Sequence, residues 1–480
     1  MEDHMMCPIY TAARKKPRHI AILENNEAIT YKQLDERIDA FAVSLFERGV
    51  ASQSRIAIVS HASSTYIALL WAAWRLGVMV FPFNPRFPSH SLANWIKNYR
   101  CAHVITEKDP LFSSSVFLKK PRISSVKKDY SLHQLATILL TSGSTGDPKL
   151  AAHTFGNYVW NAKGARDRMP LNESDRWLLT LPLYHVGGLS ILFRVFLAQA
   201  ALVIPPKKEP LNESLKKNGI SHVSLVHTQL YRLLLHMPFP LMLKAALVGG
   251  SAIQDSMVIQ AVQKGIPVFK TYGLTEMTSQ VTCGFKKKNS KDVASSGTVL
   301  PYRDYSISET GEILVKGLPL FKGYLNKQNM IILPLDKNGW FETQDIGRKN
   351  KDGSLTVLGR RDHVFISGGE NIQPEEIETY LLSFKGISEA LVVPYPDPEF
   401  GFRPLAFMDC DPALSVTSDA LRGFLEDRLP KYKIPIGFFY FPEESAFSSK
   451  QEAFNQFKIR RFQLSQWVKT NPFSGLKPLA

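Results

Sequence analysis

The sequence of 480 residues has few of the features that mark secreted proteins and metalloproteins. Its four cysteines are scattered and do not form the paired spacing of a zinc site or a disulfide framework; they are Cys7, Cys101, Cys283 and Cys410. We expect them to be small buried side chains in a protein of the reducing cytoplasm. The first residues include acids and no apolar core segment, so we expect no signal peptide.

Long hydrophobic runs are also missing. The most apolar stretches, 66–83 and 189–206, are interrupted by Arg75 and by Arg194 with Gln199. Neither stretch offers the roughly 18 uninterrupted apolar residues of a membrane helix, so no membrane span is expected. We find no Gly-x-Ser-x-Gly elbow, no His-Glu-x-x-His string and no Gly-x-Gly-x-x-Gly loop, which disfavours hydrolases, zinc proteases and dinucleotide-binding enzymes.

Positive charge is in excess, with a formal net charge of +15. Such a balance suggests nucleic acid as one partner. However, the lysines are spread in short pairs, with one triplet at Lys286–Lys288, and no basic stripe interleaves with aromatic residues. A solvated surface that steers anionic substrates is therefore favoured. The alternative from a different functional class is a basic nucleic-acid-binding protein.

The length predicts two or more domains. Up to about residue 300, strand-like runs such as 177–186 alternate with helical patterns such as 66–76, which predicts an α/β fold with parallel sheets. Thr30 with Gln33 predicts a capping box at a helix start. Beyond that point the pattern changes to short strands with glycine-rich turns and then to a small α+β region. We place the domain boundary at Gly359–Asp362.

Residues 136–149 carry the most informative chemistry. The apolar run 136–140 predicts a buried strand. Glycines and residues with hydroxyl side chains follow this strand, and a lysine follows them. Glycine amides, hydroxyl groups and a mobile cation suit a phosphate site; the alternative is a plain Ser/Gly surface loop. The candidates for nucleotide binding are Thr141, Ser142, Gly143, Ser144, Thr145, Gly146 and Lys149.

This string differs from the common phosphate loop, whose two glycines lie five positions apart. It resembles the signature loop of the acyl-adenylating (AMP-binding) superfamily, which includes acyl-CoA synthetases, firefly luciferase and the adenylation domains of peptide synthetases. All nine positions of the form Thr-Ser-Gly-Ser/Thr-Thr-Gly-x-Pro-Lys match, and the departure is Leu150, where glycine is frequent.

The resemblance extends over nearly the whole chain and implies a fold and a reaction. It implies a large N-terminal adenylate-forming domain over residues 1–360, built of parallel and mixed sheets with flanking helices. A small, mobile α+β C-terminal domain over 361–480 would act as a lid that turns on a hinge near Asp362. The enzyme would be an AMP-forming acid–thiol ligase with ATP, Mg²⁺ and coenzyme A: it adenylates a carboxylate, releases pyrophosphate and transfers the acyl group to CoA.

Residues 271–276 lie where the superfamily has its adenine, phosphate and Mg²⁺ motif. An aromatic face suits a purine, so Tyr272 and Gly273 are expected at the adenine. Thr275 is expected at the α-phosphate, and Glu276 is expected to hold Mg²⁺, which prefers oxygen ligands. Without the resemblance, a capped helix start would be the favoured interpretation.

Two strings further along are implied at the ribose and the domain junction. In 341–345, Asp345 is the ribose candidate, although Gln344 stands where the superfamily has glycine; the alternative is a turn aspartate. In 359–362, Arg360 is implied at the ribose and Asp362 at the hinge.

The C-terminal candidates come from the same resemblance. Gly368 and Gly369 are implied to line the channel for the CoA thiol. Lys458, in a Lys-x-x-Arg string, is implied to reach the α-phosphate during adenylation, with Lys450 as the competing candidate. The implied catalytic set is Lys458, His185, Thr275 and Glu276.

The acyl pocket is implied next to His185, with Gly249, Gly250 and Ser251 as another wall. The longer strings at 175–190, 227–232 and 368–376 resemble those of bacterial 2-succinylbenzoate–CoA ligases of menaquinone synthesis. That acid has two carboxylates, and Arg232 is a candidate for the one that is not activated, because a guanidinium matches a carboxylate; an exposed helix arginine is the alternative.

Several points stay open at this stage. Another aromatic or a medium-chain acid is the alternative substrate within the same class, and a non-catalytic relative is a further alternative. The sequence does not fix the oligomeric state, for which a homodimer is one option.

Overall fold

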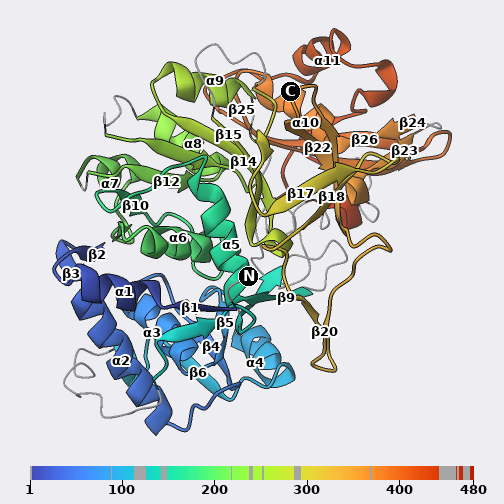
Figure 1. Ribbon diagram of the computed structural model, residues 1–480. Coiled ribbons are helices and arrows are strands. Elements are labelled where there is room, and N and C mark those ends of the chain that lie inside the picture. The colour runs from blue at the N-terminus through green and yellow to red at the C-terminus, as the bar shows by residue number, and fades with distance from the viewer. Residues whose placement is uncertain are drawn as a thin grey trace.

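The computed structural model describes residues 3–87, 89–112, 126–141, 149–217, 219–236, 242–250, 253, 255–285, 293–367, 370–442, 461, 464–468 and 476–479. Figure 1 shows α2 (Tyr31–Glu47), in blue, toward one end of the molecule and α11 (Ser418–Glu426), in red, toward the other. The α/β class expected from the sequence is confirmed by a set of mixed sheets flanked by helices.

A nine-stranded sheet supports much of the candidate site. Its central strands are parallel and its edges are antiparallel. In spatial order the strands are β16 (Thr298–Val299), β15 (Ser279–Phe285), β14 (Val268–Leu274), β13 (Ala245–Val248), β12 (His222–Leu225), β10 (Arg176–Leu178), β11 (Ala201–Ile204), β2 (Ile20–Glu24) and β3 (Glu27–Thr30).

A seven-stranded sheet carries the two ends of the predicted phosphate loop. Strands β8 and β9 run antiparallel, and Thr141 pairs with Lys149 in register, which brings the two ends of the loop together. In spatial order the strands are β20 (Ile331–Ile332), β19 (Gly323–Leu325), β9 (Lys149–Thr154), β8 (Leu135–Thr141), β5 (Met79–Phe83), β4 (Arg55–Val59) and β6 (His103–Thr106).

Three smaller sheets complete the strand content of the described residues. An antiparallel sheet follows the nine-stranded one in sequence, and a sheet near the C-terminus forms the small α+β region. The former contains β17 (Arg303–Ile307), β18 (Glu312–Gly317), β21 (Phe341–Lys349) and β22 (Leu355–Arg360). The latter contains β24 (Glu370–Ile372), β23 (Phe365–Ser367), β26 (Gly401–Cys410), β25 (Ile387–Asp397) and β27 (Phe438–Tyr440), and a separate ribbon pairs β1 (His4–Met6) with β7 (Asp129–Ser131).

The helices cover the sheets and connect their parallel strands. In chain order they are α1 (Pro8–Lys15), α2 (Tyr31–Glu47), α3 (Ser64–Arg75), α4 (Ser89–Asn98), α5 (Phe155–Arg166), α6 (Val186–Leu197), α7 (Leu211–Lys217), α8 (His227–Leu235), α9 (Asp255–Gln263), α10 (Pro374–Ser383) and α11 (Ser418–Glu426). Short 3-10 turns are η1 (Pro110–Phe112), η3 (Thr275–Met277), η4 (Arg361–His363) and η5 (Lys431–Lys433).

Local sequence signals account for many of these boundaries. The capping box predicted at Thr30 and Gln33 is present at the start of α2. Beyond the end of α3, Gly77 adopts a φ of +77°, a conformation that favours glycine. Within the described parts of the chain, no helix is both long and apolar enough to cross a bilayer.

The prediction of one strand over 177–186 was wrong. β10 ends at Leu178, and the chain then turns, with the Thr180 amide donating to the Leu178 carbonyl and its hydroxyl donating to the Ser224 carbonyl. Pro182 has no N–H to give to a ladder. The segment after β10 therefore lies along the carboxyl edge of the sheet and leads to the start of α6.

A buried ionic cluster joins α2, α3 and the segment before β7. The side chain of Arg75 is fully buried, and its guanidinium pairs with Asp35 at 2.5 Å and with Asp39 at 2.6 Å. Lys128 approaches the same Asp39 carboxylate at 2.5 Å. The cluster holds the helices of the first part of the chain in one arrangement, because a buried charge is tolerated only with its partners.

We expect Arg75→Leu to lower stability by about 3–5 kcal/mol, because it leaves partly buried carboxylates without their main partner. Arg37→Leu is the control, since it removes an ion pair to an exposed Glu27 and is expected to cost about 1 kcal/mol or less. Denaturant unfolding followed by fluorescence measures both. Equal losses for the two variants would contradict a structural role for the cluster.

Candidate active site

Three strands bring the adenine and ribose candidates together. Tyr272 lies near the end of β14, and its hydroxyl donates to Asp345 Oδ2 at 2.7 Å. Asp345 and Arg360 are register partners across β21 and β22, and Arg360 Nη1 donates to Asp345 Oδ1 at 3.1 Å. Burial and the charge of Asp345 raise the pKa of Tyr272, so the phenol remains a hydrogen-bond donor at neutral pH. One carboxylate thus joins residues that are far apart in the sequence.

Gln344, which departs from the superfamily string, occupies a conformation that favours glycine. Its φ is +64°. Its amide donates to Glu312 Oε1 at 2.7 Å, and its side-chain oxygen accepts from Arg361 Nη2 at 2.8 Å. Arg361 also forms an ion pair with Glu312. These contacts offset the strain of a left-handed residue, which is of order 1–3 kcal/mol.

The predicted phosphate and metal residues lie directly after β14. Thr275 and Glu276 form the turn η3, and Thr278 closes it with a φ of +53°. The carbonyl of Thr275 accepts a hydrogen bond from the buried Nε2 of His153 at 2.8 Å. Burial lowers the pKa of His153 to about 4, so the ring is neutral at pH 7. The neutral ring of His153, on β9, therefore fixes the backbone of this turn.

The carboxylate of Glu276 has a fixed partner of its own. Tyr324, on β19, donates from its hydroxyl to Glu276 Oε1 at 2.6 Å. The Nζ of Lys149 lies 5.2 Å from the centroid of the Tyr324 ring. Lys149, Tyr324 and Glu276 therefore form one connected group, although they come from three different segments. The sequence strings predicted Lys149 and Glu276 but did not predict Tyr324.

This group fits a magnesium ion that is shared with a polyphosphate. No cluster of three or more acidic, histidine or cysteine ligands occurs among the described residues. Mg²⁺ is commonly bound by one or two carboxylates together with waters and substrate phosphates, so a single glutamate is a sufficient protein contribution.

His185 stands at the N-cap position of α6, at the carboxyl edge of the nine-stranded sheet. Its ring meets that of Tyr184 edge to face, with centroids 4.8 Å apart. Burial lowers the pKa of His185 to about 4, so it is a neutral ring at pH 7. A neutral imidazole suits contact with an acyl group and donates or accepts a hydrogen bond without adding charge.

The two described glycines of the acyl string follow β13. A Cβ on Gly249 would lie 2.6 Å from Thr271 Cγ2 and 2.9 Å from the Thr271 carbonyl oxygen. Gly250 has a φ of +84°. Both observations explain why glycine is needed where this loop passes close to β14. Parallel strands β10, β12, β13 and β14 end at the same edge, which places these glycines and Tyr272 on one side of the sheet.

Arg232, the sequence candidate for the second carboxylate, does not lie with His185 and the two glycines. It lies on α8 with an exposed side chain.

A different arginine, Arg194 on α6, is 5% exposed and was not singled out as a site residue from the sequence. Its Nη2 donates to Asn161 Oδ1 at 3.1 Å and to Ser279 Oγ at 3.4 Å, and its buried Nε has no partner. Burial lowers the pKa of Arg194 to about 10, so it keeps its charge at neutral pH.

The charge of Arg194 has no carboxylate partner within the described residues. Ser279, its neighbour, begins β15 just after the turn that carries Thr275 and Glu276. A buried cation with an unused donor next to the candidate site is a feature expected of an anion-binding group. Sequence reasoning missed it because the helix containing it is otherwise apolar and its burial is not visible in the pattern.

Several predicted residues lie outside the described residues. They are Ser142, Gly143, Ser144, Thr145, Gly146, Ser251, Gly368, Gly369 and Lys458, together with the competing Lys450.

Asp362, the predicted hinge, accepts from Arg360 Nε at 2.9 Å and from Nη2 at 3.2 Å. Arg461, the arginine of the Lys-x-x-Arg string, is buried and bonds the Glu378 carboxylate at 2.7 Å and the Val392 carbonyl at 2.6 Å.

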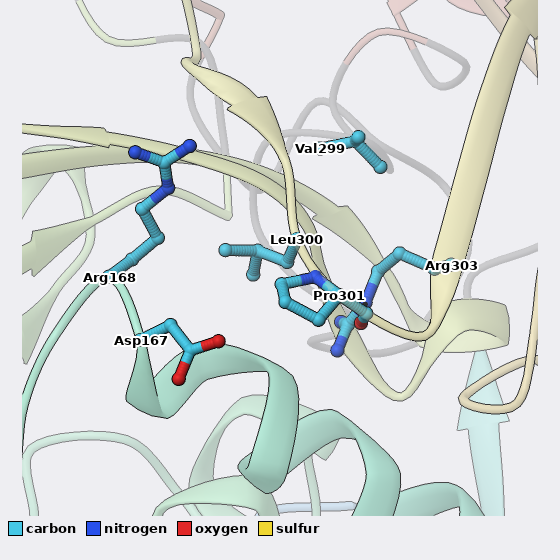
Figure 2. Close-up of a pocket in the computed structure, with 6 residues that line it drawn as sticks. All are labelled: Asp167, Arg168, Val299, Leu300, Pro301 and Arg303. Atoms are coloured by element: carbon cyan, nitrogen blue, oxygen red, sulfur yellow. Dashed lines mark hydrogen bonds between the residues drawn. The ribbon is translucent and has the colours of Figure 1, made fainter.

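A separate pocket of about 500 Å³ contains none of the predicted site residues (Figure 2). It lies between the end of α5 and the β16–β17 connection. Its buried Arg303 donates to backbone carbonyls, including that of Pro301 at 3.1 Å, and Arg168 donates to Thr298 Oγ1 at 2.5 Å. Both arginines thus serve to tie segments of the chain together.

The chain is similar to known proteins over most of its length. The model of a family described as AMP-binding enzyme matches residues 9–325. The 2-succinylbenzoate–CoA ligase of Escherichia coli is 32% identical, covering 94% of this chain and 95% of that protein. The corresponding enzyme of Salmonella typhimurium is 34% identical with the same coverage.

Solved structures agree with these relatives. The o-succinylbenzoate CoA synthetase (MenE) of Bacillus subtilis, in complex with the acyl-adenylate intermediate OSB-AMP, superimposes with a TM-score of 0.83 at 27% identity, over 91% of this chain and 95% of that one. The same enzyme with ATP and a magnesium ion gives 0.82 at 27% identity, over 91% and 96%. Escherichia coli MenE with a bound OSB-AMS analogue gives 0.77 at 29% identity, over 98% and 100%.

The conformation of Gln344 leads to a testable expectation. Gln344→Gly is expected to stay within about 1 kcal/mol of the wild type in stability, because relief of backbone strain offsets the lost contact to Arg361. Gln344→Val is expected to be less stable than Gln344→Gly by about 1–3 kcal/mol, because a β-branched residue is poorly tolerated at positive φ. Thermal unfolding of the two variants compares them directly. A valine variant as stable as the glycine variant would contradict the assigned conformation.

Proposed function

Because the chain belongs to the AMP-binding enzyme family, we propose that it is an ATP-dependent acid–CoA ligase that converts 2-succinylbenzoate to 2-succinylbenzoyl-CoA in menaquinone biosynthesis. The observation that supports the adenylation step is the contact of both Tyr272 and Arg360 with the carboxylate of Asp345. The substrate is assigned from relatives that are named 2-succinylbenzoate–CoA ligases and match nearly the whole chain.

The nucleotide is held by residues from separate segments. Tyr272 and Gly273 contact the adenine, and Asp345 accepts from the ribose hydroxyls while Arg360 fixes its orientation. The loop 141–146 with Lys149, together with Thr275, holds the phosphates. Glu276 would hold Mg²⁺, which would supply positive charge to neutralise the phosphates. The described part of this arrangement is supported by the contacts around Asp345 and Glu276.

Charge is the main barrier to the first half-reaction. A carboxylate must approach an anionic α-phosphorus, and the two repel unless cations and amides neutralise the phosphates and fix an in-line geometry. Lys149 and Lys458 supply positive charge. The neutral His185 adds none at the acyl group, so the cations stay concentrated at the phosphates.

The second half-reaction transfers the acyl group to CoA. The thiolate attacks the carbonyl of the acyl adenylate and AMP leaves. The small domain over 361–480 turns near Asp362, moves Lys458 away and brings Gly368 and Gly369 to the thiol channel. The first half-reaction requires ATP and the second requires CoA. Both compounds are available in the cytoplasm, where we place the protein.

The second carboxylate of 2-succinylbenzoate needs a cation that is withdrawn from water. Arg194 satisfies this requirement, since it is buried next to Ser279 and has an unused Nε–H. Arg232, the candidate from the sequence, is exposed on α8 and would offer its charge to solvent. We therefore assign the second carboxylate to Arg194. Another aromatic or a medium-chain acid is the alternative substrate within the same class.

The function is tested with purified protein, ATP, Mg²⁺, CoA and a panel of acids, with AMP release as the measurement. We expect 2-succinylbenzoate to be preferred over benzoate and octanoate by a factor of 10² or more in kcat/KM, which corresponds to about 3 kcal/mol. Preference for benzoate or octanoate would overturn the assigned acid while leaving the ligase chemistry intact. Failure of every acid to support exchange of labelled pyrophosphate into ATP would overturn the ligase assignment.

The assignment of Arg194 has its own test. Arg194→Met is expected to lower kcat/KM for 2-succinylbenzoate by about 30-fold or more, because loss of a buried charge partner costs 2–5 kcal/mol. Benzoate, which lacks the second carboxylate, is expected to lose little, and Arg194→Lys is expected to recover part of the loss.

Arg232→Met is the matched control and should behave as the wild type. A selective loss in Arg232→Met, with Arg194→Met unaffected, would return the role to Arg232.

A further inference from the structure

We propose that Tyr324 is a positioning residue for adenylation: it orients the carboxylate of Glu276 toward Mg²⁺ and places Lys149 beside it. This inference rests on the proposed function, and it adds a residue that the sequence strings did not contain. The argument uses strand register, ring packing, the hydroxyl contact and the way η3 is held.

Strand register places the ring. β19 pairs antiparallel with β9, and Tyr324 lies opposite Ala151. Side chains alternate along a strand, so Lys149 points to the same face as Ala151 and is the diagonal neighbour of Tyr324. The 5.2 Å between Lys149 Nζ and the ring centroid is the contact expected from this register. The aromatic ring thus holds the lysine at the end of the phosphate loop.

Packing then fixes the ring itself. Phe321 meets it edge to face at a centroid distance of 4.8 Å, and the ring of Phe341 lies 6.5 Å from Tyr324 and 5.5 Å from Phe321. Such pairs add about 0.5–1.5 kcal/mol beyond burial. A phenylalanine at 324 would keep these contacts, so packing alone does not account for a hydroxyl at this position.

The hydroxyl donates to Glu276 Oε1 at 2.6 Å. A phenol is protonated at neutral pH and a carboxylate only accepts, so Tyr324 is the donor in this contact. A glutamate has three side-chain torsions, and one strong hydrogen bond to a fixed ring restricts them. One carboxylate oxygen is thereby committed to Tyr324 while Glu276 keeps acceptor capacity for a metal ion.

The same short segment also holds the backbone of η3. The amide of Phe321 donates to the carbonyl of Glu276 at 2.7 Å, while His153 donates to the carbonyl of Thr275. Segment 321–324 therefore fixes both the main chain and the side chain of Glu276. Mg²⁺ requires near-ideal octahedral geometry at 2.0–2.1 Å, so a carboxylate that is free to rotate would bind it more weakly.

The test uses the full-length protein and the variant Tyr324→Phe. A hydrogen bond to a charged group contributes about 1.5–3 kcal/mol, so we expect the Mg²⁺ concentration for half-maximal pyrophosphate exchange to rise by about 10-fold or more. We expect kcat at saturating Mg²⁺ to change less than this value. Transfer to CoA from pre-made adenylate is expected to be unchanged, because it does not use the pyrophosphate metal.

Binding provides a readout independent of turnover. Calorimetric titration of ATP with and without Mg²⁺ gives the gain in ATP affinity that Mg²⁺ confers. This gain is expected to fall by about 10-fold in Tyr324→Phe, with ATP affinity in the absence of Mg²⁺ unchanged. Tyr324→Leu removes the ring as well, so it should show the same loss and also bind metal-free ATP more weakly, because Lys149 loses its aromatic partner.

Tyr305→Phe is the matched control. It removes a similar hydroxyl contact, to the carbonyl of Gly353 at 2.9 Å, and should leave the dependence on Mg²⁺ at the wild-type value. If both Tyr324 variants show the same Mg²⁺ gain as Tyr305→Phe, the hydroxyl serves only stability and the inference is overturned. If the wild type catalyses no exchange with any acid, the proposed function fails, and the ATP titration still decides the role of Tyr324.

Discussion

The contact that organises the candidate site is the shared use of the Asp345 carboxylate. Tyr272 approaches it from the nine-stranded sheet, and Arg360 approaches it from the neighbouring strand of the antiparallel sheet. Each carboxylate oxygen is thereby committed to one donor, so the side chain has a single orientation. The positions that we propose for the adenine and the ribose follow from this contact, and η3 continues directly from the strand that carries Tyr272.

The partners of the buried arginines distinguish Arg194, which we propose to bind the substrate, from Arg75 and Arg303. Arg75 is buried with two aspartates, so its charge is satisfied within the protein. Arg303 is buried among backbone carbonyls that accept from it. Arg194 contacts the amide of Asn161, the hydroxyl of Ser279 and the ring of Trp177, and none of these carries a negative charge. A desolvated charge costs free energy unless something compensates it, and for Arg194 we assign that compensation to the substrate.

The sequence predicted the fold class, the capping box of α2 and the family, because each depends on local patterns or on contiguous strings. The site residues in those strings remain predictions, and several of them lie outside the described residues. The sequence did not predict Tyr324, His153 or Arg194, whose roles depend on strand register and on burial across segments that are far apart in the chain. The strand expected over 177–186 was wrong because an apolar pattern does not reveal that the chain turns after Leu178.

The unusual turn at Gln344 has a consequence for the domain rotation that we propose near Asp362. Arg361 is bonded to both Glu312 and Gln344, and Asp362 follows it immediately. A rotation that began before Arg361 would have to break a partly buried ion pair, whereas one that begins after it leaves the pair intact. We therefore propose that the pivot lies on the C-terminal side of Arg361. Glutamine, at the position where the superfamily string has glycine, would then connect the strand of the ribose candidate Asp345 to the last residue before the proposed pivot.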